Sequence, residues 1–235
     1  MKAMIFAAGL GTRLKPLTYS KPKALVELNG KPLLQHNIKN LIKLGVKDII
    51  INIHHFPKMI IDFLAANNNF GINIKISDER KLLLDTGGGL KKASDFFMDG
   101  NPFLLFNSDI ICDTNLKAVY NLHIKSKTVA TLLVRERESS RYLLFDDLNN
   151  LCGWENVKTG EKIITRQSSN LKRFSFSGIQ IINPQIFKYF PVENKFSIIN
   201  FYLQVSKKEN ITYFNHTKDS WFDVGSEEKL REAEK

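Results

Sequence analysis

Short apolar runs alternate with helical stretches along the first half of the chain. Residues 2–8 form an apolar run, and residues 48–53 form a second run that is rich in isoleucine. Runs of this length are typical of buried parallel strands. Residues 33–45 place their apolar side chains at helical spacing and stop at a glycine, which predicts a helix. The alternation continues with a helix at 57–66, a strand at 72–76, a helix after the glycines at 87–89, a strand at 102–107, a helix at 114–126 and a strand at 128–134.

This order of elements predicts the fold class. Strands that alternate with helices form right-handed βαβ units, so we expect an α/β fold with a doubly wound, mostly parallel central sheet. Ligands of such a sheet bind at the carboxyl ends of its strands. The second half is less regular, with strands expected at 141–145 and 173–182 and a helix at 196–208. Because no repeat, low-complexity tract or linker interrupts the sequence, we expect one domain over residues 1–235.

Composition limits the class of protein further. The chain has 235 residues, of which 43% are hydrophobic and 25% charged, as in globular proteins and unlike disordered ones. No apolar run approaches the roughly 18 residues of a membrane span, and the first residues lack a cleavable signal. We therefore expect a cytoplasmic protein with no membrane partner. Cys112 and Cys152 lack the spacing of a zinc site or a disulfide framework, so we expect reduced thiols.

The charge of the chain favours an anionic ligand. The formal net charge is +10 and the pI is near 9.5. The lysines are scattered rather than gathered into a polybasic tail, and aromatic residues are not interleaved with them as stacking platforms for nucleic acid would be. We therefore expect no nucleic-acid partner and favour a small polyphosphate.

A glycine-rich loop follows the first expected strand. Gly9 and Gly11 let the main chain approach a ligand closely, while exposed N–H groups, Arg13 and Lys23 supply positive potential. The loop lacks the third glycine of a dinucleotide fingerprint and does not match the P-loop pattern. It still predicts a cradle for phosphate groups, whose candidate residues are Ala8, Gly9, Gly11, Thr12, Arg13 and Lys23.

Three consecutive glycines follow Asp85 and Thr86. Each glycine costs helix stability of order 1 kcal/mol, so their presence indicates backbone that is left uncovered where a helix opens. We expect this backbone to hydrogen bond to the edge of a planar base, with Thr86, Gly87 and Gly88 as the candidate contacts. A flexible turn is the alternative.

Two aspartates that follow strand-like segments are candidate metal ligands. Asp109 comes after the apolar segment 102–107, and Asp223 comes after Trp221 and Phe222. Singly, each would be read as a cap or turn residue. Together with a phosphate cradle they predict a Mg²⁺ site, because Mg²⁺ prefers a few carboxylates, waters and substrate phosphates.

Other polar residues carry weaker patterns. His36, His54 and His55 lack the spacing of metal ligands, so we expect none of them to bind a metal. Glu155 follows a Gly-Trp pair, and the pair Ser177-Gly178 lies late in an expected strand. We treat these residues as candidate contacts to a sugar.

Together these segments resemble the sugar-1-phosphate nucleotidyltransferases, the enzymes that make nucleotide-activated sugars. Within that family, the short form with a Thr-Gly-Gly-Gly run is most similar to N-acetylmuramate-1-phosphate uridylyltransferases and next to mannose-1-phosphate guanylyltransferases. The resemblance spans nearly the whole chain and is carried by residues 7–18, 21–23, 85–89, 107–109, 176–179 and 221–225.

The resemblance implies a Rossmann-like, glycosyltransferase-A-like nucleotidyltransferase domain. Its nucleotide-binding half would be residues 1–110, and its sugar-phosphate-binding half residues 111–235. Ser108 stands where glycine is common, and the segment 138–165 matches poorly, which leaves the sugar open. The implied roles are catalysis by Arg13, Lys23 and Asp109, Mg²⁺ binding by Asp109 and Asp223, base contact by the backbone of Gly87 and Gly88, and sugar-phosphate contact by Asn107, Glu155, Ser177 and Gly178.

Longer relatives in this family carry a left-handed β-helix or long extra helices after such a domain. The present chain ends at Lys235, soon after a short helix. We therefore expect neither acetyltransferase activity nor the oligomers that such tails build, but a monomer or small homo-oligomer.

The reaction expected from the resemblance is Mg²⁺-dependent nucleotidyl transfer from a nucleoside triphosphate to a sugar-1-phosphate, which gives a nucleoside diphosphate sugar and pyrophosphate. UTP with N-acetylmuramate-1-phosphate, in cell-wall precursor metabolism, is the first expectation for the substrates. Guanylyl transfer to mannose-1-phosphate is the alternative. A non-catalytic nucleotide-sugar-binding protein is a further alternative, although such a sensor could dispense with the pair Asp109 and Asp223.

Overall fold

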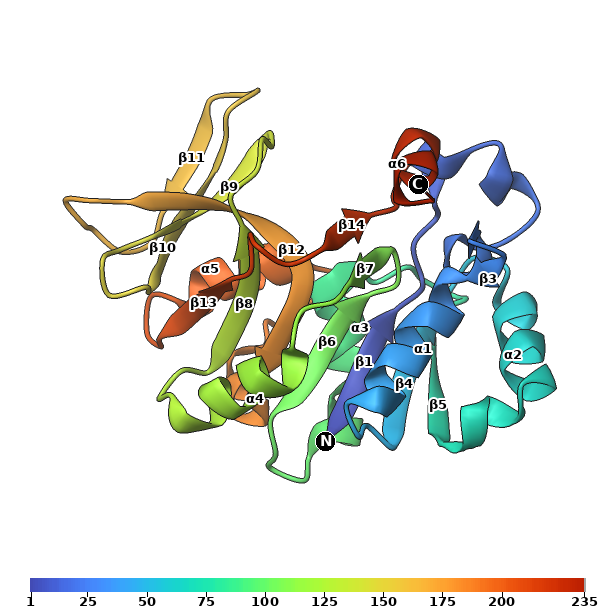
Figure 1. The fold of residues 1–235 in the computed structure, drawn as a ribbon. Coiled ribbons are helices and arrows are strands. Elements are labelled where there is room, and N and C mark those ends of the chain that lie inside the picture. Colours follow the sequence, from blue (N-terminus) through green and yellow to red (C-terminus); the bar gives the residue numbers. More distant parts are fainter. Residues whose placement is uncertain (235) are drawn as a thin grey trace.

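A ten-stranded mixed sheet runs through the computed structural model, which describes residues 1–234 (Figure 1). Its N-terminal part consists of β1 (Lys2–Phe6), β4 (Asp48–Ile53), β5 (Asn73–Asp78) and β6 (Phe103–Asn107). These strands lie in the order β6-β1-β4-β5, and every neighbouring pair is parallel. Their carboxyl ends therefore meet at one edge of the sheet.

The C-terminal part of the sheet is mostly antiparallel. Its strands are β8 (Ala130–Arg135), β9 (Arg141–Phe145), β10 (Leu151–Asn156), β11 (Glu161–Ile164), β12 (Lys172–Ile182) and β13 (Ile211–Asn215). The long strand β12 pairs antiparallel with β6, β8 and β9, and in this way joins the two parts. From β9 the sheet continues antiparallel through β10 to β11, while β13 pairs with β8 in parallel.

Two small antiparallel sheets lie outside the main sheet. One pairs β2 (Glu27–Leu28) with β3 (Lys31–Pro32). The other pairs β7 (Ile110–Cys112) with β14 (Trp221–Asp223), and so brings a segment near the end of the chain beside the residues that follow β6.

Helices connect the parallel strands of the N-terminal part. The α-helices are α1 (Leu33–Lys43), α2 (Pro57–Ala66), α3 (Asp85–Ala93), α4 (Leu116–Lys125), α5 (Ile198–Val205) and α6 (Glu227–Ala233). The short 3₁₀ segments are η1 (Thr12–Leu14), η2 (Leu17–Tyr19), η3 (Lys23–Leu25), η4 (Asn68–Gly71), η5 (Ser94–Phe97) and η6 (Pro184–Tyr189). No helix within residues 1–234 is long and apolar enough to cross a membrane.

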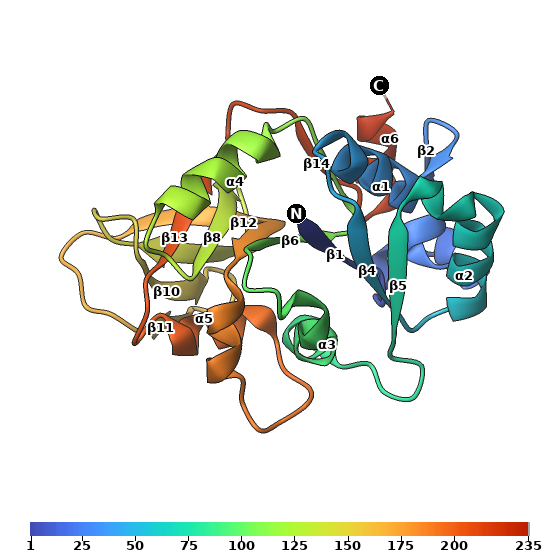
Figure 2. The same cartoon turned by 90° about the horizontal axis from the view of Figure 1, so that it is seen from below.

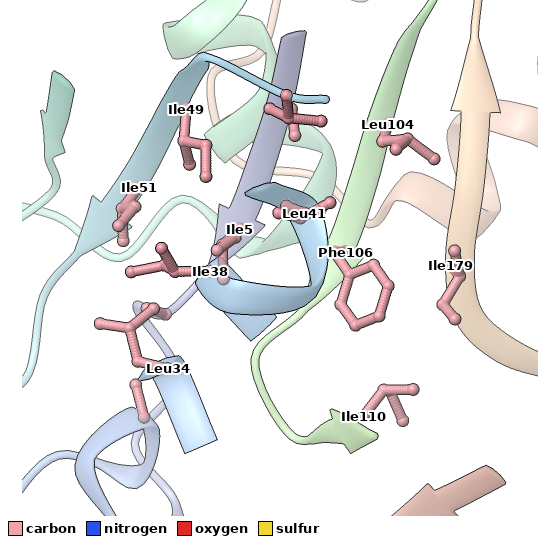
Figure 3. Close-up of a cluster of buried hydrophobic side chains, with 14 of the residues drawn as sticks. Ile5, Leu34, Ile38, Leu41, Ile49, Ile51, Leu104, Phe106, Ile110 and Ile179 are labelled. Atoms are coloured by element: carbon pink, nitrogen blue, oxygen red, sulfur yellow. The ribbon is translucent and has the colours of Figure 1, made fainter. Parts of the chain in front are cut away.

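Alternate residues of the central strands pack against helices on opposite faces of the sheet. Ile5 of β1 belongs to a hydrophobic cluster with α1, α2 and α4, whereas Met4 belongs to a second cluster with α3 and α5. Figure 2 shows α1 and α4 on one side of the sheet and α3 and α5 on the other. In Figure 3, Ile38 and Leu41 of α1 lie against the side chains of the central strands. The side-chain alternation of a strand thus produces the two-sided core.

A third hydrophobic cluster ties the two ends of the chain together. Leu14 and Leu33 from the N-terminal region pack with Val224 and with Leu230 of α6. Figure 1 shows α6 beside the blue N-terminal loop. This packing holds the segment after β14 against the glycine-rich loop.

The α/β fold with helices on both faces of the sheet confirms the fold class expected from the sequence, and the expected strands at 48–53 and 141–145 match β4 and β9. One boundary was wrong, because α3 begins at Asp85 and includes the three glycines, whereas the sequence predicted a helix after them. The hairpin β10–β11 and strand β13 were not predicted.

Candidate active site

A cavity of about 390 Å³ opens at the carboxyl ends of the parallel strands. Most of its lining comes from the residues that follow β1, β4, β5 and β6, and Lys195 enters from the segment before α5. We call it the first cavity. Its lining residues are Phe6, Ala7, Ala8, Gly9, Lys23, Asn52, Glu79, Leu83, Asp85, Thr86, Asn107, Ser108, Asp109 and Lys195.

The glycine-rich loop presents open backbone donors beside this cavity. The Ala7 N–H donates to Asn52 Oδ1 at 2.8 Å, which anchors the start of the loop. Among residues 1–234, no protein acceptor takes the N–H groups of Gly9, Leu10 or Gly11. Gly11 has φ +65°, and a Cβ there would lie 2.8 Å from Cγ2 of Thr18, so this turn requires glycine. Free N–H groups in a tight loop form a concave site for anionic oxygens.

A buried polar pair supports the floor of the first cavity. Asn52 Nδ2 donates to Glu79 Oε1 at 2.7 Å, and the Leu84 N–H donates to Glu79 Oε2 at 3.1 Å. Burial raises the pKa of Glu79, although these two hydrogen bonds oppose the rise. Neither side chain was predicted from the sequence. The signal for Asn52 was a polar residue within an apolar strand, where burial requires a hydrogen-bonding partner.

Asp109 lies where the first cavity meets the small β7–β14 sheet. Its carboxylate forms an ion pair with Lys23, and both side chains are mostly buried. The Val224 N–H donates to the Asp109 carbonyl at 2.9 Å, and Asp223 pairs with Ile110 in the strand register. The structure therefore brings together the regions of Asp109 and Asp223, which are far apart in the sequence.

Asp223 is surrounded by positive charge. Its Oδ2 accepts from Lys229 at 2.9 Å, and its Oδ1 accepts from the Gly225 N–H at 3.0 Å. Burial raises the pKa of Asp223, but the hydrogen bond from Lys229 and the charges of Lys229, Lys23 and Arg13 outweigh burial, so the pKa lies below its ordinary value. Asp223 is therefore a carboxylate at neutral pH.

The two carboxylates fit the requirements of a Mg²⁺ ion. Each offers hard oxygen donors, and the β7–β14 pairing brings together their segments, with Asp109 in the first cavity and Asp223 beside a second one. Each carboxylate is balanced by a lysine, Asp109 by Lys23 and Asp223 by Lys229, so the site already matches acidic oxygens with positive charge.

A second cavity of about 440 Å³ adjoins Asp223. Its lining combines aromatic and aliphatic side chains with cationic groups, hydroxyl groups and the Asp223 carboxylate. Arg137 was not predicted from the sequence, because nothing in its local pattern separates it from the neighbouring charged residues. The lining residues are Arg13, Arg137, Ser139, Ser140, Arg141, Tyr142, Leu143, Trp154, Phe176, Ile199, Asp223 and Lys229.

The triple glycine is explained by packing within the chain. The Phe196 carbonyl accepts from the N–H groups of Gly87 and Gly88, at 2.9 and 3.2 Å. A Cβ on Gly87 would lie 2.4 Å from the Phe196 ring, and a Cβ on Gly88 would lie 2.0 Å from the Asn194 carbonyl oxygen. This corrects the expectation that these N–H groups are uncovered for a base, because residues 194–196 occupy that space. Thr86 does line the first cavity.

Two of the expected sugar contacts lie together between the cavities. Asn107 lines the first cavity, and a Cβ on Gly178 would lie 2.8 Å from the Asn107 amide nitrogen. Gly178 has φ +77° and sits where the β12–β8 register shifts. This position requires glycine, both for its backbone angle and for the close approach of Asn107.

The other two expected sugar contacts, Ser177 and Glu155, line neither cavity. Ser177 is 1% exposed, and its hydroxyl shares a hydrogen bond with His216 Nε2 at 2.7 Å. Glu155 lines neither cavity and lies 3.7 Å from the charged nitrogens of Lys162 and Arg173. The expected side-chain contact of Ser177 with sugar is therefore corrected, because its hydroxyl is committed to the core. The Glu155 side chain is 17% exposed, and its contact with sugar stays a prediction.

An α/β sheet with open loop donors and acidic residues at its carboxyl edge is typical of proteins that bind nucleotide phosphates. Residues 2–146 match the family model described as nucleotidyl transferase, and the chain belongs to this family. This finding confirms the resemblance seen in the sequence.

Curated relatives with similar sequences carry the names of nucleotidyltransferases. A mannose-1-phosphate guanyltransferase from Yarrowia lipolytica is 29% identical over 96% of this chain and 61% of that protein. A mannose-1-phosphate guanylyltransferase catalytic subunit beta from Dictyostelium discoideum is 34% identical over 79% of this chain and 50% of that protein. The chain thus spans about three fifths or less of these relatives.

Solved structures share the fold over nearly the full length of both chains. A putative glucose-1-phosphate thymidylyltransferase from Bacillus anthracis has a TM-score of 0.83 at 19% identity, and the match covers 100% of this chain and 94% of that one. HddC from Yersinia pseudotuberculosis has a TM-score of 0.77 at 25% identity, with 99% and 97% covered. HddC has also been solved in complex with GMP-PN.

Proposed function

We propose that this protein transfers a nucleotidyl group from a nucleoside triphosphate to a sugar-1-phosphate and releases pyrophosphate, with GTP and mannose-1-phosphate as the preferred pair. One observation carries the proposal: two cavities adjoin one cluster of carboxylates and cations. The first cavity contains Asp109 and Lys23, and the second contains Asp223 and Arg13. Two substrates can therefore meet at this cluster.

The attacking group in this reaction needs no general base. An oxygen of a sugar phosphate is already an anion and attacks the α-phosphorus in line, with pyrophosphate as the leaving group. The obstacle is the repulsion between two polyanions, so the protein must neutralise and align them. Asp109 and Asp223 would hold Mg²⁺, which when bound supplies positive charge between the phosphates. Arg13, Lys23 and the free N–H groups of the loop would bind the remaining phosphate oxygens.

We assign the nucleotide to the first cavity and the sugar phosphate to the second. All the lining of the first cavity falls within residues 6–109, apart from Lys195, and all the lining of the second falls within residues 137–229, apart from Arg13. This supports the division into a nucleotide half at 1–110 and a sugar-phosphate half at 111–235. The nucleotide contacts we propose are Ala8, Gly9, Gly11, Thr12, Arg13, Lys23 and Thr86.

The relatives favour guanylyl transfer over the uridylyl transfer that the sequence resemblance placed first. Those described above are named mannose-1-phosphate guanyltransferases, and HddC was solved with a guanosine nucleotide analogue, GMP-PN. We therefore place GTP with mannose-1-phosphate ahead of UTP with N-acetylmuramate-1-phosphate.

A substrate matrix tests the proposal. Five nucleoside triphosphates are combined with a panel of sugar-1-phosphates in the presence of Mg²⁺, and pyrophosphate release is measured. We expect turnover with GTP and mannose-1-phosphate, and none after chelation of the metal. Turnover only with UTP and N-acetylmuramate-1-phosphate would restore the uridylyl assignment. Nucleotide-sugar binding without any turnover would favour a sensor.

A further inference from the structure

Two arginines lie over the ring of Trp221 in the C-terminal half of the molecule. The guanidinium carbons of Arg135 and Arg137 are 5.5 and 5.0 Å from the ring centroid. Both side chains project from the end of β8 and the residues after it. The aromatic contact is therefore common to the two, but their hydrogen bonding differs.

The guanidinium of Arg135 stabilises the fold. It donates to the carbonyl oxygens of His216, Thr217 and Asp219 at 2.7 to 2.9 Å. These bonds hold the turn between β13 and β14, and so fix the chain just before Asp223. Arg135 therefore has a structural role, because its guanidinium is hydrogen bonded to the backbone.

Arg137 has no comparable partners. Its Nε is buried and has no hydrogen-bond acceptor within residues 1–234, and its one side-chain hydrogen bond is a long contact of 3.4 Å to the Glu138 carbonyl. Both oxygens of nearby Asp223 already accept hydrogen bonds from Gly225 and Lys229. A buried donor such as this Nε is unfavourable without an acceptor, so an anion that reaches it would gain a charge-assisted hydrogen bond.

The second cavity, which Arg137 lines, is chemically complementary to a phosphate ester on a sugar ring. Trp154 and Phe176 supply apolar aromatic surface, while Ser139 and Ser140 supply hydroxyl groups. A planar guanidinium presents paired N–H donors that match two phosphate oxygens. The lining is mostly polar and rich in cationic groups, with an apolar part beside them, which suits an anion attached to a sugar ring.

We propose that Arg137 binds the 1-phosphate of the acceptor sugar and aligns it toward the carboxylate cluster. The inference rests on the proposed function, and it deepens it by assigning the acceptor anion to a residue outside the segments that carry the family resemblance. If Arg137 were only a structural partner of Trp221, its replacement would lower stability without a selective effect on the acceptor.

Steady-state kinetics test the assignment. We expect Arg137→Gln to raise the KM for the sugar-1-phosphate about 10- to 100-fold, with a much smaller change in the KM for the nucleoside triphosphate. Arg137→Lys, which keeps the charge but loses the fork of donors, should lie between wild type and Arg137→Gln. Arg231→Gln is the matched control, because Arg231 is an exposed arginine of α6 that pairs with Glu227 and lines neither cavity. An unchanged acceptor KM in both Arg137 variants would overturn the proposal.

A binding measurement separates this inference from the proposed function. The only tryptophans, Trp154 and Trp221, line the cavity or contact Arg137, so their fluorescence reports on this site. Inorganic phosphate and mannose-1-phosphate should each change the emission of the wild type saturably, and Arg137→Gln should weaken this binding about tenfold or more. Arg137-dependent binding without turnover would refute the proposed reaction but support the anion site. Equal binding by Arg137→Gln, or no binding by the wild type, would overturn the anion site.

Discussion

The two cavities share a border of carboxylates and cations but are built from different kinds of structure. The first lies at the ends of four parallel strands, and its polar groups are mainly loop N–H groups and short side chains such as Asn52 and Asp109. The second lies against an antiparallel region, where long side chains such as Arg137 and Trp154 form the walls.

This difference indicates which of the two cavities can change its substrate specificity. Backbone donors are fixed by the path of the chain and suit a group that every reaction of this type shares, such as a triphosphate. Side chains on an antiparallel sheet can be replaced without a change of fold, so they suit the part of the reaction that varies. We therefore expect mutations in the first cavity to affect all substrates, and mutations in the second to affect the acceptor.

The largest effect is expected at the shared border. Asp109→Asn and Asp223→Asn each remove one of the two carboxylates that would hold the metal, and each leaves Lys23 or Lys229 without its ion-pair partner. We expect turnover to fall by about 100-fold or more for every substrate pair, measured as pyrophosphate release.

An aspartate on the surface provides the control for these variants. Asp62→Asn removes an exposed ion pair with Lys58 within α2, and surface pairs of this kind contribute little to stability. Its turnover should match the wild type. If Asp109→Asn or Asp223→Asn retained full activity with a normal melting temperature, the proposed metal site would be wrong.

Acid should weaken the C-terminal region through two buried histidines. Burial lowers the pKa of His123 to about 4, and burial together with the charge of Arg135 lowers the pKa of His216 to about 4. The unfolded chain binds these protons near the ordinary pKa of 6.5, so stability is complete above pH 6.5 and is lost as the pH falls toward 4. The loss approaches about 3 kcal/mol for each histidine.

Denaturant unfolding at pH 7.0 and pH 4.5, followed by tryptophan fluorescence, checks this expectation. His216→Gln should be less stable than the wild type at pH 7.0, because it disturbs the bonds to Ser177 and Thr114. It should also lose less stability than the wild type between the two pH values, since one titrating group is gone. An identical loss in wild type and variant would show that His216 does not titrate in this range.

The N-terminal half was predictable from sequence because its physical signals are local. Apolar runs such as 48–53 must be buried on both faces, and they alternate with amphipathic segments such as 57–66. The β10–β11 hairpin was missed because β11 is exposed at all its residues and so lacks the apolar and polar alternation of a half-buried strand. Strand β13 was missed because it depends on pairing with β8, far away in the sequence.

The candidate site also contains residues that could be predicted from the sequence and residues that could not. Glycine and aspartate at strand ends carry a local signal, so Gly11 and Asp109 could be found from sequence alone. The partner of a side chain carries no such signal: nothing local to Ser177 indicates a hydrogen bond with His216, and nothing local to Arg137 indicates that it lacks an acceptor. The role of Gly88 was predicted wrongly for the same reason, because the residues that cover it, 194–196, are far away in the sequence.

Gly88 is tightly packed and Gly9 is not, so substitutions at these two glycines separate an effect on packing from an effect on ligand binding. Gly88→Ala would place a methyl group against the Asn194 carbonyl, and overpacking of this kind costs about 1–3 kcal/mol. Gly9 has nothing within 4 Å of an added Cβ, so Gly9→Ala should fold normally but raise the KM for the nucleoside triphosphate. Thermal melts and kinetics of the two variants distinguish these roles. A normal melting temperature for Gly88→Ala would mean that residues 194–196 do not pack on α3 in solution.

The smallest effect is expected for Ser177→Ala, which tests whether this residue belongs to the core or to the acceptor site. The Ser177 hydroxyl is buried and bonded to His216, whose other ring nitrogen bonds to Thr114. Loss of one such hydrogen bond costs about 1 kcal/mol, so the free energy of unfolding should fall by that amount. The KM for the sugar-1-phosphate should stay at the wild-type value, in contrast to Arg137→Gln. A raised acceptor KM with unchanged stability would return Ser177 to the sugar site and would mean that the His216 bond is broken when substrate binds.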